Sequence, residues 1–452
     1  MMVVTKDHKV VVTASISKYT RIYTLFHNLS ENILKVLFHR ILVLRMNSVR
    51  ACVLCVLIYT GGVLGTNQNH PKERIRNNSE LLLLELAERA ARDGYTVSDH
   101  AVQTEDGYVI TMFRLQRPGG GVKGLPVLLM PGLLMSAASW FDVGPCTALA
   151  YLIADAGHDL WLGNVRGSYY SRQHAWLDPD TDSQYWRFCI HEMGQYDVPA
   201  SIDYILSETG AEKINYIGFS QGGGAFFIMC SERPEYREKV NVMIALAPAT
   251  RQLNTKSVAF RILTEYYENI EYELMKNGVW EALPKGGTLQ SFFQNFCVIS
   301  DVALDMCELI KDVLDAPNHG SLKKLALQAA VSGFPAGTSV HNMAWFGQNV
   351  KSKNFQKFDY GREQNLVRYG SVQPPAYNLS VVTVPTVVIY GKNDGVVDIR
   401  DVNWLLGKLP NVLEAYKLKD PLWTHFDFVL NKNIPKLLVP KIKEYLSAKS
   451  IA

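Results

Sequence analysis

Apolar residues gather in short continuous runs along the chain, and these runs alternate with longer segments in which apolar positions have helical spacing. Continuous apolar runs are typical of parallel strands, because helices cover both faces of such a sheet. We expect strands at 125–134, 158–164, 213–217, 240–248, 384–391 and 413–419. We expect helices at 80–95, 145–157, 196–210, 221–234, 398–409 and 433–448. The alternation predicts an α/β protein whose mostly parallel sheet is covered on both sides, with a kink at Pro440 in the last helix.

Two segments depart from this alternation. Residues 97–116 are predicted to form a β-hairpin around an Asp-Gly turn. Residues 250–375 hold apolar and aromatic stretches, such as 258–274 and 291–299, but no clear strand. Because this segment lies between two predicted sheet strands, a helical insertion that caps one edge of the sheet fits better than a separate domain.

Residues 46–65 are typical of a signal peptide: a Met, a short basic region, an apolar stretch at 51–64 and then small residues. The apolar stretch is too short for a comfortable membrane span. Cleavage after it would leave 66–452 as the mature domain, and residues 1–45 would then be a gene-model extension. The alternative is that 1–45 form a cytosolic tail and that the apolar stretch is a signal anchor.

Charge is unevenly distributed along the chain. Residues 1–45 hold seven Lys/Arg and two Asp/Glu, a charge of +5, whereas the whole chain of 452 residues carries +3. The remainder therefore carries −2 and gives no reason to expect nucleic acid as a partner. A hydrophobic content of 48% suits a globular protein with a sizeable core.

Entry into the secretory pathway would permit disulfides and N-linked glycans. Five cysteines follow the expected cleavage point, and this odd number leaves at least one free or paired between chains. Cys297 and Cys307 are near in sequence and form the preferred pair, although both could be buried free thiols. Asn77 and Asn378 stand in Asn-x-Ser sequons and are candidate glycosylation sites.

The stretch 218-GFSQG-222 lies between a predicted strand and a predicted helix. A sharp strand-to-helix turn can present a nucleophilic serine, and flanking glycines remove Cβ atoms that would clash there. The helix N-terminus also favours the negative charge that develops on a bound oxygen. We therefore predict that Ser220 is a nucleophile; the alternative is a small-residue turn with no chemical role.

A serine hydroxyl needs a base, and in the α/β-hydrolase arrangement the chain order is Ser, acid, His. His425 is the only histidine beyond residue 341, and it lies in a loop after the last predicted strand. Asp394 lies in a turn just past the strand at 384–391 and is the preferred acid, which would orient His425 and stabilise its imidazolium. Asp398 and Asp401 are rivals, but Asp398 is better placed as a helix N-cap.

Acyl transfer also needs donors for the tetrahedral oxyanion. One should be the backbone N–H of Gln221, the residue after the nucleophile. The other should come from the loop that ends the strand at 125–134. Pro131 has no N–H to donate, so we prefer the N–H of Leu133. The alternative is that this loop is an ordinary strand-ending turn.

From about residue 80 to the C-terminus the chain resembles the acid lipase family of gastric and lysosomal lipases, which are α/β-hydrolases with a helical cap. The motifs that carry the resemblance are 132-GLLMSAASW-140, 161-WLGNVRGSYYSR-172, 192-EMGQYDVPASIDYI-205, 216-YIGFSQGGG-224, 336-AGTSVHNM-343, 356-QKFDYG-361 and 424-THFDF-428. The resemblance places the nucleophile at Ser220, the acid at Asp394, the base at His425 and the oxyanion donors at Leu133 and Gln221.

The resemblance also implies a cap disulfide between Cys297 and Cys307. The chain departs from the family pattern at two positions. The family usually has His-Gly before the oxyanion leucine, where this chain has Pro131-Gly132. It usually has Gly-His-Ser-x-Gly, where this chain has Phe219 in place of the His. Neither change removes a catalytic group, but both bear on the acyl pocket and on pH preference.

The family resemblance implies hydrolysis of neutral lipid esters, either triacylglycerols or cholesteryl esters, to free fatty acid, with no metal or organic cofactor. The expected partner is lipid at a droplet, emulsion or membrane surface, with the cap as a lid, and no obligate protein partner is evident. The expected location is the secretory pathway, either secreted or in the lysosomal lumen. The alternatives are a carboxylesterase or thioesterase for soluble esters, acyl transfer to an acceptor other than water, and a catalytically silent lipid-binding protein.

Overall fold

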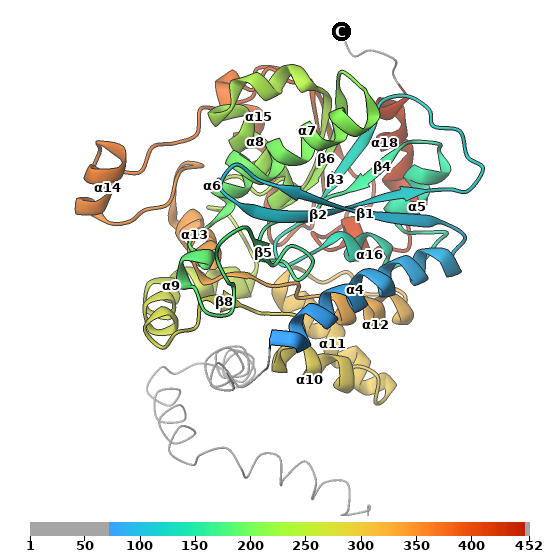
Figure 1. Ribbon diagram of the computed structural model, residues 1–452, viewed down its shortest axis with the longest axis horizontal. Coiled ribbons are helices and arrows are strands. Elements are labelled where there is room, and N and C mark those ends of the chain that lie inside the picture. Colours follow the sequence, from blue (N-terminus) through green and yellow to red (C-terminus); the bar gives the residue numbers. More distant parts are fainter. Residues whose placement is uncertain (1–71, 448–452) are drawn as a thin grey trace, which may run out of the picture. The chain divides into compact units, whose positions relative to one another are not determined.

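A computed structural model describes residues 72–447 of the protein, with side chains from Leu81 onward (Figure 1). The expected signal peptide at 46–65 and the segment 1–45 lie outside the described residues. Within the described part of the chain, no helix is both long and apolar enough to cross a membrane.

The centre of the fold is one twisted sheet of nine strands. Along the sheet the order is β1-β2-β4-β3-β6-β7-β10-β11, and the short β5 pairs with β2. The strands are β1 (Thr96–Gln103), β2 (Tyr108–Gln116), β3 (Val127–Met130), β4 (Leu160–Leu162), β5 (Gln173–His174), β6 (Ile214–Phe219), β7 (Val240–Leu246), β10 (Thr386–Tyr390) and β11 (Val412–Lys417). From β4 to β11 all neighbours are parallel, whereas β1 and β2 form the predicted antiparallel hairpin.

Helices cover both faces of this sheet, which confirms the predicted α/β class (Figure 1). They are α4 (Lys72–Arg92), α5 (Leu149–Asp155), α6 (Ile190–Glu192), α7 (Val198–Thr209), α8 (Gln221–Glu232), α15 (Ile399–Leu406), α16 (Asp427–Leu430), α17 (Ile434–Leu437) and α18 (Val439–Leu446). Alternate strand residues point to opposite cores. Tyr216 and Met243 pack with α7 and α8, whereas Ile217 and Ile244 pack with α5 and α18.

The chain reverses or bends at several short turns between these elements. The short helical turns are η1 (Ala137–Phe141), η2 (Ser183–Trp186), η3 (Met193–Asp197), η4 (Pro234–Lys239) and η5 (Leu379–Val381). The predicted closing helix is divided in two, because α17 ends at Leu437 and α18 begins at Val439 with Pro440 in its first turn. Proline is tolerated in a first turn, where its missing N–H has no helical partner to lose.

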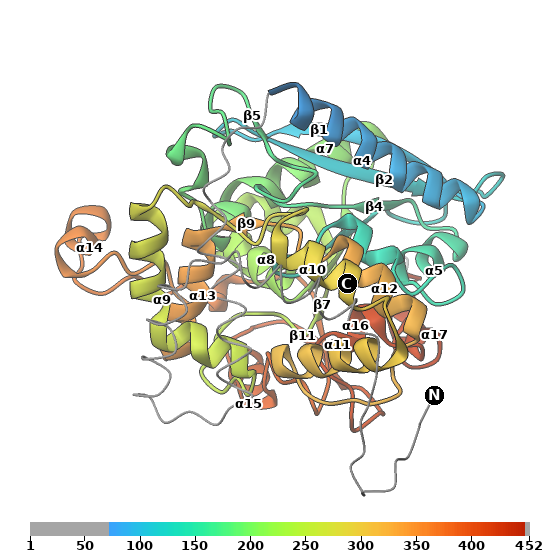
Figure 2. The same cartoon turned by 90° about the horizontal axis from the view of Figure 1, so that it is seen from below.

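Between β7 and β10 the chain forms a helical insertion, which we call the cap (Figure 2). Its helices are α9 (Val258–Lys276), α10 (Thr288–Phe296), α11 (Asp301–Leu314), α12 (Lys324–Gly333), α13 (Val340–Lys351) and α14 (Arg362–Tyr369). The sequence shows no clear strand in this segment, and the structure adds one short strand pair there. β8 (Glu281–Ala282) and β9 (Thr338–Ser339) form a small antiparallel pair, and two residues are too few to give a sequence pattern.

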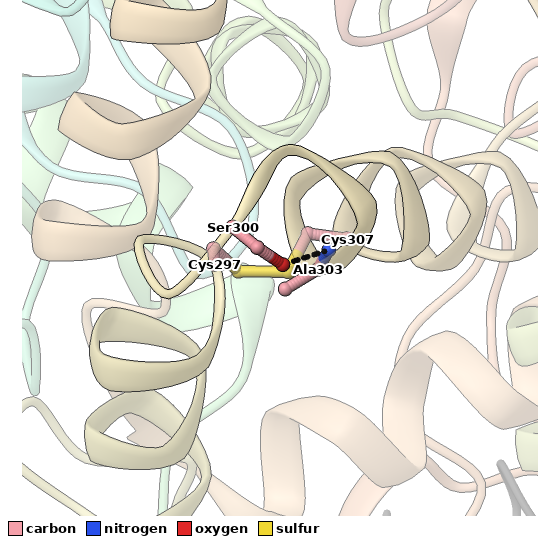
Figure 3. Close-up of a disulfide and its surroundings, with 4 residues drawn as sticks. All are labelled: Cys297, Ser300, Ala303 and Cys307. Carbon is pink, nitrogen blue, oxygen red and sulfur yellow. Dashed lines mark hydrogen bonds between the residues drawn. A yellow bond between two sulfur atoms is a disulfide. The ribbon is translucent and has the colours of Figure 1, made fainter. Parts of the chain in front are cut away.

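Cys297 and Cys307 are joined by a disulfide within the cap (Figure 3). It connects the end of α10 to α11, whose N-cap Ser300 accepts a hydrogen bond from the N–H of Ala303. Cys146 is exposed, Cys189 and Cys230 are buried, and none of these three is in a disulfide within the described residues. The disulfide therefore crosslinks two helices of the cap. Within the described residues, the sheet has no disulfide.

Candidate active site

Ser220 lies at the sharp turn from β6 into α8. Its backbone has φ 51° and ψ −114°, a conformation that costs strain for any residue except glycine. A Cβ at Gly218 would lie 2.8 Å from the backbone of Gly222, and one at Gly222 would lie 2.8 Å from the carbonyl oxygens of Met130 and Pro131. The two glycines therefore allow the close approach that this strained turn requires.

The structure brings Ser220, His425 and Asp394 together in one hydrogen-bonded chain. His425 Nε2 lies 2.9 Å from Ser220 Oγ, and His425 Nδ1 lies 2.8 Å from Asp394 Oδ2. All three side chains are buried. They come from the loops after β6, β10 and β11, because the carboxyl ends of parallel strands lie at one edge of the sheet.

Asp394 fixes both the orientation and the tautomer of His425. Its Oδ1 accepts the N–H groups of Val396 and Val397, at 2.9 and 2.7 Å, so Oδ2 is left for the imidazole. Because an ionised carboxylate can only accept, Nδ1 of His425 donates to it, and Nε2 then accepts from the hydroxyl of Ser220. This arrangement can remove a proton from the serine.

The electrostatic surroundings favour the protonated form of His425. Burial lowers the pKa of the imidazole, but the charge and hydrogen bond of Asp394, together with the charge of Asp315, outweigh this effect and raise it. A positive charge on the imidazole of His425 would therefore be stabilised by the residues that hold the ring.

The two rival aspartates have other structural roles. Asp398 is the N-cap of α15, as predicted, and its side chain accepts the N–H of Arg400. Asp401 binds the beginning of the cap, because its carboxylate accepts from Arg251 Nε and from the backbone N–H of Asn254. Neither carboxylate is hydrogen-bonded to His425 in the described structure.

The two expected oxyanion donors stand beside the serine. Gln221 is the first residue of α8, so its backbone N–H has no acceptor within that helix. The loop that holds Leu133 is packed against Ser220, because a Cβ at Gly132 would lie only 3.3 Å from Ser220 Cβ. Donation by Leu133 and Gln221 to an oxyanion stays a prediction.

Phe219, which departs from the family pattern, packs directly on the imidazole. Its ring centroid lies 4.8 Å from that of His425 and 5.9 Å from that of Phe428. Trp140 approaches the same ring edge-on, with centroids 6.2 Å apart. The imidazole of His425 therefore has an apolar aromatic neighbour on one face.

Two buried residues beside the site were not predicted. Asn342 of α13 donates from Nδ2 to Oε1 of Gln221 at 2.9 Å. The motif 336-AGTSVHNM-343, which contains Asn342, is the sequence feature that could have pointed to it. Asp315 of the cap accepts the N–H of Gly395 and of Phe426. No motif distinguishes it from the other aspartates of the cap.

The two sequons lie in different settings. Asn378 is exposed at the start of η5, where its Oδ1 accepts the N–H of Ser380. Asn77 belongs to helix α4, in the part that precedes Leu81, where only the backbone is described. Glycosylation of either residue stays a prediction.

The chain is similar to known lipases over most of its length. Lipase 1 of Drosophila melanogaster is 35% identical over 379 residues, which are 83% of each chain. Gastric triacylglycerol lipase of Bos taurus is 35% identical over 76% of this chain and 86% of its own. The human lysosomal acid lipase/cholesteryl ester hydrolase is 34% identical over 77% of this chain and 87% of its own.

Family models and solved structures agree with these relatives. The crystal structure of a proposed lipase from Sulfolobus solfataricus has a TM-score of 0.51 at 16% identity, covers 78% of this chain and 95% of its own, and supports the fold alone. The family model described as alpha/beta hydrolase fold matches residues 126–432, and the partial alpha/beta-hydrolase lipase region matches residues 86–143. The resemblance to the gastric and lysosomal acid lipases is thus confirmed, and the chain belongs to the α/β-hydrolase lipases as a carboxylic ester hydrolase.

Proposed function

We propose that this protein hydrolyses neutral lipid esters, either triacylglycerols or cholesteryl esters, through an acyl-enzyme on Ser220. The observation that carries the proposal is the hydrogen-bonded chain Ser220–His425–Asp394 at a strained strand-to-helix turn. Serine hydrolases on unrelated folds use this constellation. It needs no metal or organic cofactor.

The first half of the reaction acylates the serine. His425 Nε2 takes the hydroxyl proton of Ser220 as Oγ attacks the ester carbonyl carbon. The N–H groups of Leu133 and Gln221 receive the oxyanion, and Asp394 stabilises the imidazolium. The C–O bond to the alcohol then breaks, and His425 gives its proton to the departing oxygen.

The second half returns the enzyme to its starting state. Water replaces the alcohol, and His425 takes a proton from it as its oxygen attacks the acyl carbon. The tetrahedral intermediate then collapses to free fatty acid, and His425 returns the proton to Ser220 Oγ. The same oxyanion donors serve both halves, because the negative charge develops on the same oxygen.

The cap supports a lipid as the substrate. Large apolar side chains are exposed on and beside α10 and α11. Exposure of such side chains to water is unfavourable, so a group of them on a protein surface marks a site of contact with another apolar surface. They are Phe292, Val298, Ile299, Val302, Met306 and Leu309. This surface, which we call the apolar cap face, is suited to contact a lipid droplet, emulsion or membrane. The names of the bovine gastric and human lysosomal relatives, which refer to triacylglycerol and cholesteryl ester, support the same substrate class.

The pH dependence of activity follows from His425, which must be neutral to act as a base. The pKa of His425 is raised, so the imidazole becomes protonated at a higher pH than an ordinary histidine does. As the pH decreases, kcat/KM should therefore begin to fall at that higher pH. The relatives are gastric and lysosomal proteins, which supports a secreted or lysosomal location. An exposed sequon at Asn378 fits passage through the secretory pathway.

The test is fatty-acid release from an emulsion of long-chain triacylglycerol, scanned from about pH 4 to pH 8, by protein secreted from a chain that begins at Met46. Ser220→Ala serves as the blank, and Ser207→Ala, an exposed serine on α7, serves as the matched control. We expect release that Ser220→Ala abolishes and Ser207→Ala leaves intact. Cleavage of short soluble esters alone would favour the carboxylesterase alternative, and no cleavage of either would favour a lipid-binding protein.

A further inference from the structure

Asp315 connects the cap to both loops that carry the partners of Ser220. It follows the last residue of α11 and is only 4% exposed. Its Oδ1 accepts the N–H of Gly395 at 2.9 Å, and its Oδ2 accepts the N–H of Phe426 at 2.8 Å. Gly395 directly follows Asp394 and Phe426 directly follows His425. One carboxylate therefore spans the acid loop and the base loop.

The residues after Asp315 reinforce this bridge. The carbonyl oxygen of Pro317 accepts from Asn393 Nδ2 at 2.8 Å, next to Asp394 in sequence. Asn318 Nδ2 donates to Asp427 Oδ2 at 2.7 Å, two residues past His425. The segment 315–318 thus binds both loops, and it belongs to the cap rather than to the sheet.

We propose that Asp315 is a positioning residue, which holds the acid and base loops at the spacing that puts the imidazole between Asp394 and Ser220, and whose charge sets the pH range in which His425 acts as a base. The proposal rests on the proposed function, because it gives Asp315 a role through His425. Asp315 does not touch the reacting atoms. It acts on the groups that do.

The charge of Asp315 depends on pH near neutrality. Burial and the neighbouring charge of Asp394 raise its pKa to about 7, although His425 and the two backbone N–H groups oppose the rise. The titratable groups that face it are Asp394 from the loop after β10 and His425 from the loop after β11. When Asp315 is ionised, its charge adds to that of Asp394 and raises the pKa of His425. When it is protonated, that contribution disappears.

Two substitutions separate the hydrogen bonds from the charge. In Asp315→Asn the amide oxygen can accept one N–H, but the amide nitrogen faces the other N–H and cannot accept it. In Asp315→Ala both acceptors are lost. Both variants lack the charge equally. We expect kcat to fall about tenfold in Asp315→Asn and about a hundredfold in Asp315→Ala, because small misplacements of catalytic groups have effects of this size.

The pH profile should move by the same amount in both variants. Without the second negative charge the pKa of His425 falls, so the acid limb of kcat/KM moves to lower pH. We expect a movement of roughly half a pH unit, because Asp315 carries only part of its charge near neutrality. Asp305→Asn removes an exposed carboxylate from the same helix and is the matched control, for which we expect the wild-type profile.

The experiment measures two rates as a function of pH: hydrolysis of a soluble short-chain ester and labelling of Ser220 by a fluorophosphonate. Labelling requires Ser220 and His425 but no assumption about the natural substrate. If Asp315 were merely a structural contact, its substitutions would lower thermal stability and leave the acid limb where it is in the wild type. An unchanged acid limb in both variants, with wild-type labelling intact, would overturn the role of Asp315 alone. A wild-type protein that is not labelled at all would overturn the proposed function and this role together.

Discussion

The central strands of the sheet and the outer helices of the cap differ in how much of their side-chain surface is buried. Every side chain of β3, β6 and β7 is buried. In α9, which has nineteen residues and lies wholly in the described part of the chain, Thr264 alone is buried. α11 exposes Val302, Met306 and Leu309 to solvent. The central strands of the sheet are packed on both faces, whereas α10 and α11 of the cap present an apolar face that the rest of the described chain does not cover.

This difference divides the work of the site between two regions. The strained turn at Ser220 and the loops of Asp394 and His425 follow strands that close packing holds in place. In the proposed function the cap offers the apolar cap face to lipid, and it reaches the loops of the candidate site through Asp315 and Asn342. Changes in the sheet region should therefore abolish the chemistry, whereas most changes in the cap should alter stability or substrate preference.

The largest effect is expected from His425→Gln, which breaks the chemistry of the sheet region. Loss of the base should lower kcat about 10⁶-fold on any ester, because only binding and the oxyanion donors then accelerate the reaction. The measurement is kcat on a soluble ester and on an emulsion, with His319→Gln, an exposed cap histidine, as the control. A loss on one substrate only would show that another group serves as the base.

The next effect concerns the stability of the cap. Cys297 and Cys307 close a loop with a sequence separation of 10, so replacing both with serine should lower stability by about 2.5 kcal/mol. Limited proteolysis should then cut near α10 and α11 at a lower temperature, while the circular-dichroism melting of the sheet region moves less. Equal changes in both measurements would show that the cap and the sheet unfold as one unit.

Buried carboxyl groups in both regions should make stability depend on pH. Burial raises the pKa of Asp142, beside Arg89, to about 7 and that of Asp315 to about 7, both above the unfolded value. The stabilisation that such a carboxyl group contributes is fully present below its pKa in the unfolded chain. This stabilisation is lost as the pH rises through the pKa of the group in the folded protein. We therefore expect a lower free energy of unfolding at pH 8 than at pH 5, by about 2 kcal/mol for each group.

Urea unfolding at the two pH values measures this difference. Asp142→Asn and Asp315→Asn should each reduce it, and Asp305→Asn should not. The pH dependence in the Asp142 variant reports on the sheet region, and that in the Asp315 variant reports on its junction with the cap. If neither variant reduced the difference, these two carboxyl groups would not be the ones that titrate.

The smallest effect is expected on the apolar cap face. Val302→Ser with Met306→Gln should lower the rate on emulsified lipid several-fold, because less apolar area is available for the lipid surface. The rate on a soluble ester should stay at the wild-type value. Val367→Ser, which replaces a still more exposed apolar residue on α14, is the control. Equal losses on both substrates would show that the face supports the fold and not the interface.

The sequence was sufficient for features that follow one local rule. Ser220 stood in a glycine-flanked turn between a strand and a helix, and chain order left His425 as the single later histidine. The sequence favours Asp394 over Asp398 because a helix start explains the latter, and the structure has that N-cap. These residues could be predicted because each follows a parallel strand, and such strands present their carboxyl ends at one sheet edge.

Features that depend on tertiary contact could not be predicted. Asp315 is 79 residues before Asp394 and 110 before His425, and only the folded chain brings its carboxylate to their loops. The β8–β9 pair has two residues in each strand, too few for alternation to be visible. The sequence predicts a kink at Pro440 within one helix, but the structure has a break there, because α17 ends at Leu437 and α18 begins at Val439.

The most direct test of the proposed function is to trap the acyl-enzyme. The wild-type protein is mixed with a long-chain p-nitrophenyl ester, quenched in acid before the first turnover is complete, digested and analysed by mass spectrometry. The mechanism predicts that the acyl group is bound to the peptide that contains Ser220, and that Ser220→Ala carries none. Release of p-nitrophenol with the acyl group on Cys146 or on any residue other than Ser220 would contradict it.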